Sequence, residues 1–319
     1  MRRRMIFNST TGLNNKVDPV RLQNDKGLTE LASAMNVDID QTGRLSRRLG
    51  YSLVTSGKVH SFFDCGTTCL CVDDGYLKSF TGAALLSISQ VGSSPMGYAK
   101  VFMGDKDVVY MGNGSRALKH NVGSYSVSNW EFTQTQNVNP KNSERPSEYV
   151  GPETSRFFQS VPVPSVVEVY NGRMYAANGE NVWVSEPFAY DMFDLARGYL
   201  PFKSRVKMIK SVMTGLYVGD EDSIYFLHGS GPKDFTVTEV HRSPVIPGTD
   251  TSVDAGIFDL YGKAVLMATK EGVCLGGMDG YFKNLSEKKI RMPDASSGSA
   301  IIINNRVVFS FKKQEVICL

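Results

Sequence analysis

Apolar and polar residues alternate in short stretches along most of this chain, and each stretch ends at a glycine, an asparagine or an aspartate. Such alternation is typical of half-buried β-strands, and the turn residues between the stretches predict antiparallel hairpins. The pattern begins at KVHSFFDCGTTCLCVDDGYLKSF, residues 58–80, which reads as strand, turn, strand, turn, strand. It returns at residues 98–121, 165–186, 205–240, 257–284 and 299–319.

These segments recur roughly every 40 residues, which is the length of a propeller blade built from four strands. We therefore predict an all-β fold, a β-propeller of five or six blades of antiparallel strands over residues 51–319. Two stacked sandwiches are the alternative. Tight turns are predicted at dipeptides that such turns prefer. These are Asp74-Gly75, Asn113-Gly114, Asn171-Gly172, Asp279-Gly280 and Asn304-Asn305.

Residues 1–50 lack this pattern, and we predict that they form an extended N-terminal arm with a closing strand. The arm contains no apolar run able to fold alone, so either the domain behind it or a neighbouring subunit must hold it. Only LTELASAM, residues 28–35, indicates a short helix. A propeller must cover the edges of its first and last blades. NVDID at 36–40 and KKQEVICL at 312–319 are candidates for a shared blade.

One interval interrupts the rhythm of strands. Residues 137–164, NVNPKNSERPSEYVGPETSRFFQSVPVP, are rich in Pro, Ser, Asn and Glu and show no regular alternation. Loops of this length are uncommon in compact domains and are usually functional. We predict a long loop that either meets another subunit or wraps the surface between blades.

Composition and charge limit the partners that the chain can have. Its 319 residues are 41% hydrophobic, which is enough for a large core, and its net charge is +3. Residues 1–48 carry nine Lys/Arg and five Asp/Glu, a balance of +4 that leaves −1 for the rest. A body so close to neutral does not indicate a DNA-binding groove. No apolar stretch is long enough for a membrane helix, and no signal peptide is visible, so we expect a protein made in the cytoplasm.

The five cysteines do not follow a disulfide framework, because three of them crowd into CGTTCLC. Cys69 and Cys71 would point to one face of a strand with Cys65 nearby, and only His60 is close enough in sequence to complete a metal site. We interpret these thiols as reduced, small core side chains and predict no metal site.

No catalytic motif is present either. The histidines stand in no metal-binding or nucleophile-activating pattern, and a nucleophile elbow and a phosphate-binding loop are both missing. Paired carboxylates are harder to dismiss, since the fold sets their spacing in glycosidases and propellers host such enzymes. We nevertheless predict no enzymatic activity and no cofactor. The histidines are His60, His120, His228 and His241, and the candidate carboxylates are Asp191, Asp194, Asp220, Glu221 and Asp222.

Several phrases resemble one family of proteins. GLNNKVDPVRL at 12–22, ASAMNVDIDQTGRLSRRLGY at 32–51 and KVHSFF at 58–63 are similar to the start of the tail nozzle, or packaged-DNA stabilisation, proteins of short-tailed bacteriophages. NGRMYAANGENVWVSEPFAYDMFD at 171–194 resembles a later blade of the same proteins. The resemblance implies a virion protein, assembled in the host bacterial cytoplasm, whose copies form a ring of six below the portal and adaptor. That ring would retain the packaged double-stranded DNA and later conduct it without sequence-specific contact.

The charge distribution is compatible with what the resemblance implies. A conduit must let DNA slide, and a body of net charge −1 would bind phosphates less than a basic groove would. The arginines of the arm are then predicted to contact the adaptor or neighbouring subunits, and a solvated run of charges is the alternative. These residues are Arg2, Arg3, Arg4, Arg44, Arg47 and Arg48.

Two other functions remain open. A propeller at the tail tip that recognises a host receptor or glycan would need an exposed aromatic pocket, for which Tyr190, Phe193 and Trp183 are candidates. A glycan-degrading enzyme would need two carboxylates at close range.

Overall fold

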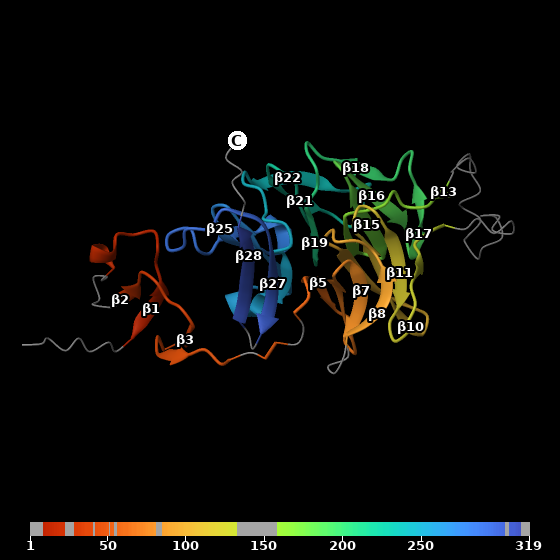
Figure 1. Ribbon diagram of the computed structural model, residues 1–319. Helices are drawn as coiled ribbons and strands as arrows, with labels where there is room; N and C mark the ends of the chain where they lie inside the picture. The colour runs from red at the N-terminus through yellow and green to blue at the C-terminus, as the bar shows by residue number, and fades with distance from the viewer. Residues whose placement is uncertain are drawn as a thin grey trace, which may run out of the picture.

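Five antiparallel sheets stand in a ring in the computed structural model, so the predicted β-propeller is confirmed and has five blades (Figure 1). The alternative of two stacked sandwiches is excluded. The structure describes residues 9–22, 29–40, 42–50, 52–53, 56–80, 85–132, 158–303 and 306–313.

In blades 1, 2, 4 and 5, neighbouring strands of the sheet follow one another along the chain. Blade 1 consists of β5 (Val59–Asp64), β6 (Cys69–Asp73), β7 (Tyr76–Phe80) and β8 (Leu85–Gln90). Blade 2 consists of β9 (Gly97–Met103), β10 (Lys106–Gly112), β11 (Ala117–Asn121) and β12 (Ser128–Asn129). Blade 4 consists of β19 (Met208–Val212), β20 (Gly215–Gly219), β21 (Ile224–His228) and β22 (Thr236–His241). Blade 5 consists of β23 (Thr251–Asp254), β24 (Lys263–Thr269), β25 (Gly272–Gly276) and β26 (Phe282–Asn284).

Blade 3 is the largest sheet. Its path is β14 (Val166–Tyr170), β15 (Arg173–Asn178), β16 (Asn181–Glu186) and β17 (Ala189–Asp194). Two short strands extend it, β13 (Phe158–Gln159) beside β17 and β18 (Tyr199–Pro201) beside β16. Of the loop predicted at 137–164, the part up to residue 157 lies outside the described residues, and the remainder begins with β13.

Apolar side chains on facing sheets join each blade to the next. In blade 1, Leu70, Val72 and Leu77 are buried against Val109 and Met111 of blade 2, as the alternation of apolar positions requires. Gly112 lets blade 3 approach blade 2, since a Cβ there would lie 2.4 Å from the carbonyl oxygen of Pro164. Similar clusters join blades 2 and 3, blades 3 and 4, and blades 4 and 5.

A charged network joins the inner parts of blades 3, 4 and 5. Lys210 of β19 lies 3.7 Å from Glu168 of β14 and 3.4 Å from Asp250, the residue before β23. Ser211 donates a hydrogen bond of 2.8 Å to Glu168 and accepts one of 2.9 Å from Lys263 of β24. Burial alone would lower the pKa of Lys210, but Asp250 and Glu168 raise it overall, so the lysine remains charged.

A separate sheet of only two strands follows blade 5. It is a hairpin of β27 (Ala295–Ile303) and β28 (Arg306–Lys313), which we call the terminal hairpin. Val307 and Phe309 pack on Leu266 and Leu275 of blade 5, so the hairpin stands where a next blade would stand. Every complete blade has at least four strands, and this sheet has two.

The arm lies beside the ring (Figure 1). It contains β1 (Thr10–Leu13), the short 3₁₀ helix η1 (Pro19–Arg21), β2 (Thr29–Leu31) parallel to β1, and a hairpin of β3 (Val37–Ile39) and β4 (Leu45–Arg47). We call β3–β4 the arm hairpin. The segment NVDID thus contains β3, which pairs with β4, and the segment KKQEVICL begins at the end of β28.

The helix predicted at residues 28–35 is wrong. Residues 29–31 form a strand, and the hydroxyl of Thr10 donates a hydrogen bond of 2.7 Å to the carbonyl of Thr29. A helix of eight residues is only marginally stable without packing. Pairing with β1 instead gives the backbone groups of residues 29–31 hydrogen-bond partners. The other short helices described are η4 (Ala255–Phe258) and η5 (Met278–Gly280). Among the described residues, none of the helices has the length and apolar character needed to cross a membrane.

Candidate functional site

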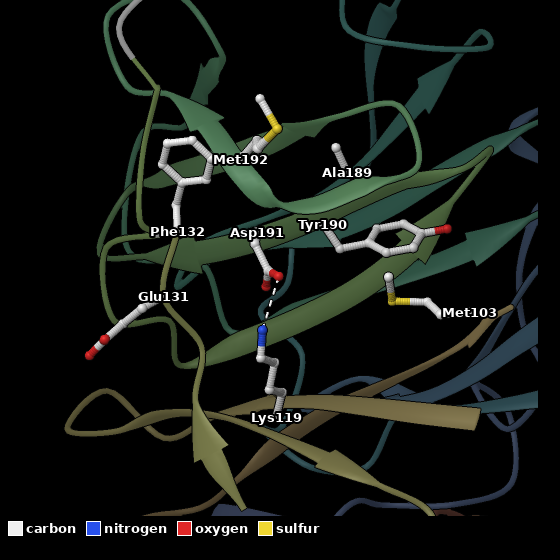
Figure 2. Close-up of a pocket in the computed structure, with 8 residues that line it drawn as sticks. All are labelled: Met103, Lys119, Glu131, Phe132, Ala189, Tyr190, Asp191 and Met192. Atoms are coloured by element: carbon white, nitrogen blue, oxygen red, sulfur yellow. Dashed lines mark hydrogen bonds and ion pairs between the residues drawn. The ribbon is translucent and has the colours of Figure 1, made fainter. Parts of the chain in front are cut away.

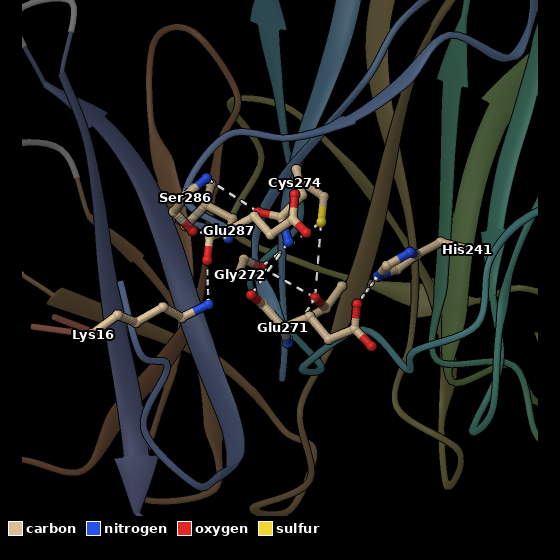
Figure 3. A network of polar contacts seen from close by, with 10 residues as sticks. Lys16, His241, Glu271, Gly272, Cys274, Ser286 and Glu287 are labelled. Atoms are coloured by element: carbon tan, nitrogen blue, oxygen red, sulfur yellow. Dashed lines mark hydrogen bonds and ion pairs between the residues drawn. The ribbon is translucent and has the colours of Figure 1, made fainter. Parts of the chain in front are cut away.

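Polar contacts attach the arm to the segment that leaves blade 5. The backbone N–H of Asn15 donates to the carbonyl of Lys289 at 2.9 Å, and its side-chain oxygen accepts from the N–H of Arg291 at 2.6 Å. The ammonium group of Lys16 donates to the carbonyl of Glu287 (Figure 3). The ammonium group of Lys289 lies 2.9 Å from the carboxylate of Glu30. The arm is therefore docked on its own chain at its root.

Docking of the arm should weaken at low pH. Hydrogen bonds from Lys289 and Asn14 lower the pKa of Glu30, so the carboxylate stabilises the docked arm above its ordinary pKa, and this contribution is lost as pH falls through the lowered value. Lys289→Met should weaken docking of the arm by up to about 1 kcal/mol, which lowers the ratio of docked to undocked arm roughly fivefold. The rate of hydrogen exchange at the backbone amides of β1 and β2 would measure this change. Lys288→Met is the control, and equal protection in both variants would contradict the role of Lys289.

Four apolar side chains of the arm and the linker after it are bare. Val20 is 90% exposed, Met35 and Leu49 are each 84% exposed, and Leu53 is 83% exposed. Single exposed apolar residues are normal on a protein surface, but here four of them lie between residues 20 and 53. The contacts that hold the arm, from Asn15, Lys16 and Glu30, are polar and cover none of these four side chains.

The structure brings three of the predicted interface arginines together on the arm hairpin. Arg44 stands in its turn, Arg47 is the last residue of β4, and Arg48 follows; all three are exposed. The guanidinium group of Arg48 lies 3.2 Å from the carboxylate of Asp38 on β3. Arg2, Arg3 and Arg4 lie outside the described residues.

The terminal hairpin exposes a second apolar surface. Ile301 is 53% exposed and its cross-strand partner Val308 is 38% exposed, and both lie on the face away from blade 5. Ile302, also 38% exposed, lies on the opposite face with Val307. Among the described residues, no buried apolar cluster joins this hairpin to blade 1, whereas such clusters join all neighbouring blades from 1 to 5. Within the described ranges, the terminal hairpin is therefore not packed against blade 1 through a buried apolar cluster, as neighbouring blades are packed against each other.

A separate cavity of about 330 Å³ lies between blades 2 and 3. Lys119 of β11 and Asp191 of β17 both line the cavity, and the ammonium group of Lys119 lies 3.0 Å from the carboxylate of Asp191 (Figure 2). Of the aromatic residues proposed for a pocket, only Tyr190 lines it; Phe193 is fully buried in the core, and Trp183 packs on Tyr199. The other lining residues are Met103, Glu131, Phe132, Ala189 and Met192.

Four of the five candidate carboxylates, Asp191, Asp194, Asp220 and Glu221, have structural partners. Asp191 pairs with Lys119, and Glu221 lies 3.0 Å from Lys207. Asp220 is buried and accepts hydrogen bonds from the N–H groups of Asp222 and Ser223, which fixes the turn between β20 and β21. In the cavity, the carboxylate of Glu131 points away from Asp191 (Figure 2).

Asp194 also serves a turn. Its side chain accepts a hydrogen bond of 3.2 Å from the N–H of Ala196, and its carbonyl accepts from the N–H groups of Arg197 and Gly198. This turn ends β17 and leads into β18.

The thiols of CGTTCLC occupy different surroundings. Cys65 packs in the cluster between blades 1 and 2, while Cys71 lies on the opposite face of β6 from Leu70 and Val72. No group of three or more His, Cys, Asp or Glu side chains within the described ranges is placed to hold a metal ion. His60 instead lies 2.9 Å from the hydroxyl of Ser61.

The other histidines also have local partners. The ring of His120 is hydrogen-bonded to the carbonyl of Ser126 at 2.9 Å. His228 lies 3.8 Å from Asp279, and His241 lies 3.5 Å from Glu271 (Figure 3).

The buried thiols should be unreactive in the folded protein. Burial raises the pKa of Cys65, Cys71 and Cys274 to about 11, and the thiolate is the reactive species. We expect iodoacetamide at neutral pH to label these residues only after denaturation, as peptide mass spectrometry would show. The guanidinium-denatured chain is the positive control. Rapid native labelling of Cys71 would contradict this placement.

No family model and no curated protein sequence matches the chain. Its structure is similar to that of BBS1N in complex with ARL6DN, with a TM-score of 0.49, 10% identity, and 86% of this chain and 83% of that chain covered. For the Pan2 WD40 domain of Neurospora crassa, the TM-score is 0.43 and the identity 8%, with 81% and 76% covered.

A third similar structure is an extracellular domain described as part of a hybrid two component system of B. thetaiotaomicron. Its TM-score is 0.48 and its identity 8%, and the match covers 84% of this chain and 33% of that one. The chain thus spans about a third of that domain's length. At these identities the likeness concerns the fold alone, and the blades of the chain itself establish that it is a β-propeller.

Proposed function

We propose that this chain is a structural protein of a short bacteriophage tail. Its copies form a nozzle ring of six below the portal and adaptor, retain the packaged double-stranded DNA, and conduct it during ejection. The resemblance of residues 12–63 to nozzle proteins suggests this role. The chain acts as an assembly component of the virion and has no substrate.

The observation that carries the proposal is the bare apolar surface of the arm. Leu49 and Leu53 are more than four-fifths exposed, at 84% and 83%, beside the exposed arginines of the arm hairpin. Apolar side chains rimmed by charged ones are typical of surfaces that another protein covers. An arm that is docked by polar contacts and carries its apolar side chains outward suits a subunit of an assembly.

The mass of the purified protein in solution tests this proposal. Light scattering or native mass spectrometry would be applied to the chain alone and mixed with the adaptor or portal protein of the same genome. We expect a closed ring, formed alone or on the partner. A chain that stays monomeric with both partners would overturn the proposal.

The cavity between blades 2 and 3 favours a second candidate, a propeller that binds a receptor or glycan at the tail tip. It is concave and combines aromatic and apolar walls, Tyr190 and Phe132 among them, with the Lys119–Asp191 ion pair. Glycan array binding by the wild type that is lost in Asp191→Asn, with Asp222→Asn as control, would support this candidate. Absence of binding to the array would remove it.

A further inference from the structure

We propose that the arm hairpin of a second copy of this chain completes the terminal hairpin, giving a four-stranded blade in the order β27, β28, β3, β4. This inference rests on the ring of the proposed function and names the contact that would build it. An extended strand that joins an unpaired sheet edge gains backbone hydrogen bonds along its whole length.

Strand number and position fit this arrangement. The complete blades have at least four strands, the terminal hairpin has two, and the arm hairpin has two. β27 lies next to β23, the first strand of blade 5, so the edge of β28 is the outer edge. β28 also lies on the side of the terminal hairpin that faces the arm (Figure 1).

The side chains of β3 match those of β28. In β28, Val307, Phe309 and Phe311 face blade 5, while the other face carries Arg306, Val308, Ser310 and Lys312. β3 alternates in the same way, with apolar Val37 and Ile39 on one face and Asp38 on the other. One face of the joined sheet would therefore be apolar, and on the opposite face carboxylates would meet cations.

Charge also decides which strand of the arm hairpin lies against β28. The segment of β3 carries Asp38 and Asp40, whereas β4 and its flanks carry Arg44, Arg47 and Arg48. Within one chain Asp38 lies 3.0 Å from Arg306, so the two side chains are complementary, and the Asp38 of a second copy would replace this partner at the start of β28. With β3 inside, the arginines of β4 stand on the outermost edge, where charged residues block further strand addition.

The chain's own arm does not fill this place. Among the described residues, no strand of the arm pairs with β28, and the arm hairpin is tied to the terminal hairpin only by the Asp38–Arg306 ion pair. The root of the arm is held at residues 286–291. A chain that carries both a donor hairpin and an open acceptor edge, without strand pairing between the two, can join its copies head to tail, and such contacts form a ring when the rotation between copies closes.

Cross-linking of mixed full-length chains tests the proposal. One chain carries Ser46→Cys on β4, and the other carries Ser310→Cys on β28; both serines are exposed, and Cys318→Ser is present in each chain. In the proposed blade the two positions are two strand spacings apart across the sheet, about 10 Å, and four residues apart along it, about 13 Å. The resulting separation of about 16 Å needs a bismaleimide with a long spacer. Because each chain has one added cysteine, the covalent heterodimer arises only between copies.

We expect roughly tenfold more heterodimer from this mixture than from the control mixture, because bound side chains meet at a high effective concentration. In the control, Thr238→Cys, an exposed position on the outer strand of blade 4, replaces Ser310→Cys. Cross-linking only within a chain that carries both Ser46→Cys and Ser310→Cys would overturn the proposal, since its own arm would then complete the blade. A ring without the heterodimer would also overturn it but would leave the proposed function standing. Absence of any ring, both alone and with the adaptor or portal protein, would overturn both.

Discussion

Replacing Trp130 with alanine is expected to lower the free energy of unfolding by about 4 kcal/mol. The side chain is 1% exposed and fills the joint between blades 2 and 3, with its ring centroid 5.0 Å from that of Tyr110 and 5.9 Å from that of Phe193. Its indole N–H donates a hydrogen bond of 3.0 Å to the carbonyl of Tyr190. The substitution therefore opens a cavity and leaves a buried carbonyl without its donor.

Equilibrium unfolding in urea, followed by circular dichroism, would measure this loss. Trp130→Phe keeps most of the ring and loses the N–H donor, so it should cost less, about 2 kcal/mol. Trp183→Ala is the matched control, because Trp183 is the only other tryptophan and is only partly buried beside Tyr199. If the Trp183 variant were the less stable of the two alanine variants, Trp130 would not be the main joint between these blades.

The blades could be predicted because their signals are local. Alternation of apolar residues and turn pairs such as Asp74-Gly75 fix a strand and its neighbour within a few residues, and both members of that pair adopt positive φ, at 49° and 81°. The helix expected at residues 28–35 failed because β2 pairs with β1, some twenty residues earlier in the chain, and no local pattern records such a pairing. The strands of the terminal hairpin were predicted at residues 299–319, but that they stand as a separate two-stranded sheet was not, since the tertiary fold sets the neighbours of a sheet.

The candidate sites were less predictable than the fold. Charge alone drew attention to Arg44, Arg47 and Arg48, which the structure places on one hairpin. Apolar residues in a sequence suggest burial, so the exposure of Leu49 had no sequence signal. In the cavity, Tyr190 was a candidate from its own segment, but Lys119 comes from another blade, 72 positions earlier, and only the packing of the two sheets brings them together.

Exchanging both Leu49 and Leu53 for serine should abolish ring assembly without changing the stability of the single chain. Their exposed fractions of 84% and 83% mean that neither side chain packs on its own propeller, so folding loses little. In the proposed ring, a neighbouring subunit or the adaptor buries both. Burial of each leucine contributes about 2 kcal/mol, and loss of both weakens association by roughly a thousandfold.

Sedimentation velocity or light scattering across a concentration series would show the shift from ring to monomer, and urea unfolding would show that the fold is kept. Tyr261→Ser is the matched control, because this side chain is 77% exposed on blade 5 and not on the arm. A general loss of surface hydrophobicity would weaken assembly in both variants. Loss in the leucine variant alone would place the contact on the arm, where these exposed apolar side chains lie beside the exposed arginines of the arm hairpin. Unchanged assembly of the leucine variant would mean that the copies associate through another surface, and the bare arm would then need a different partner.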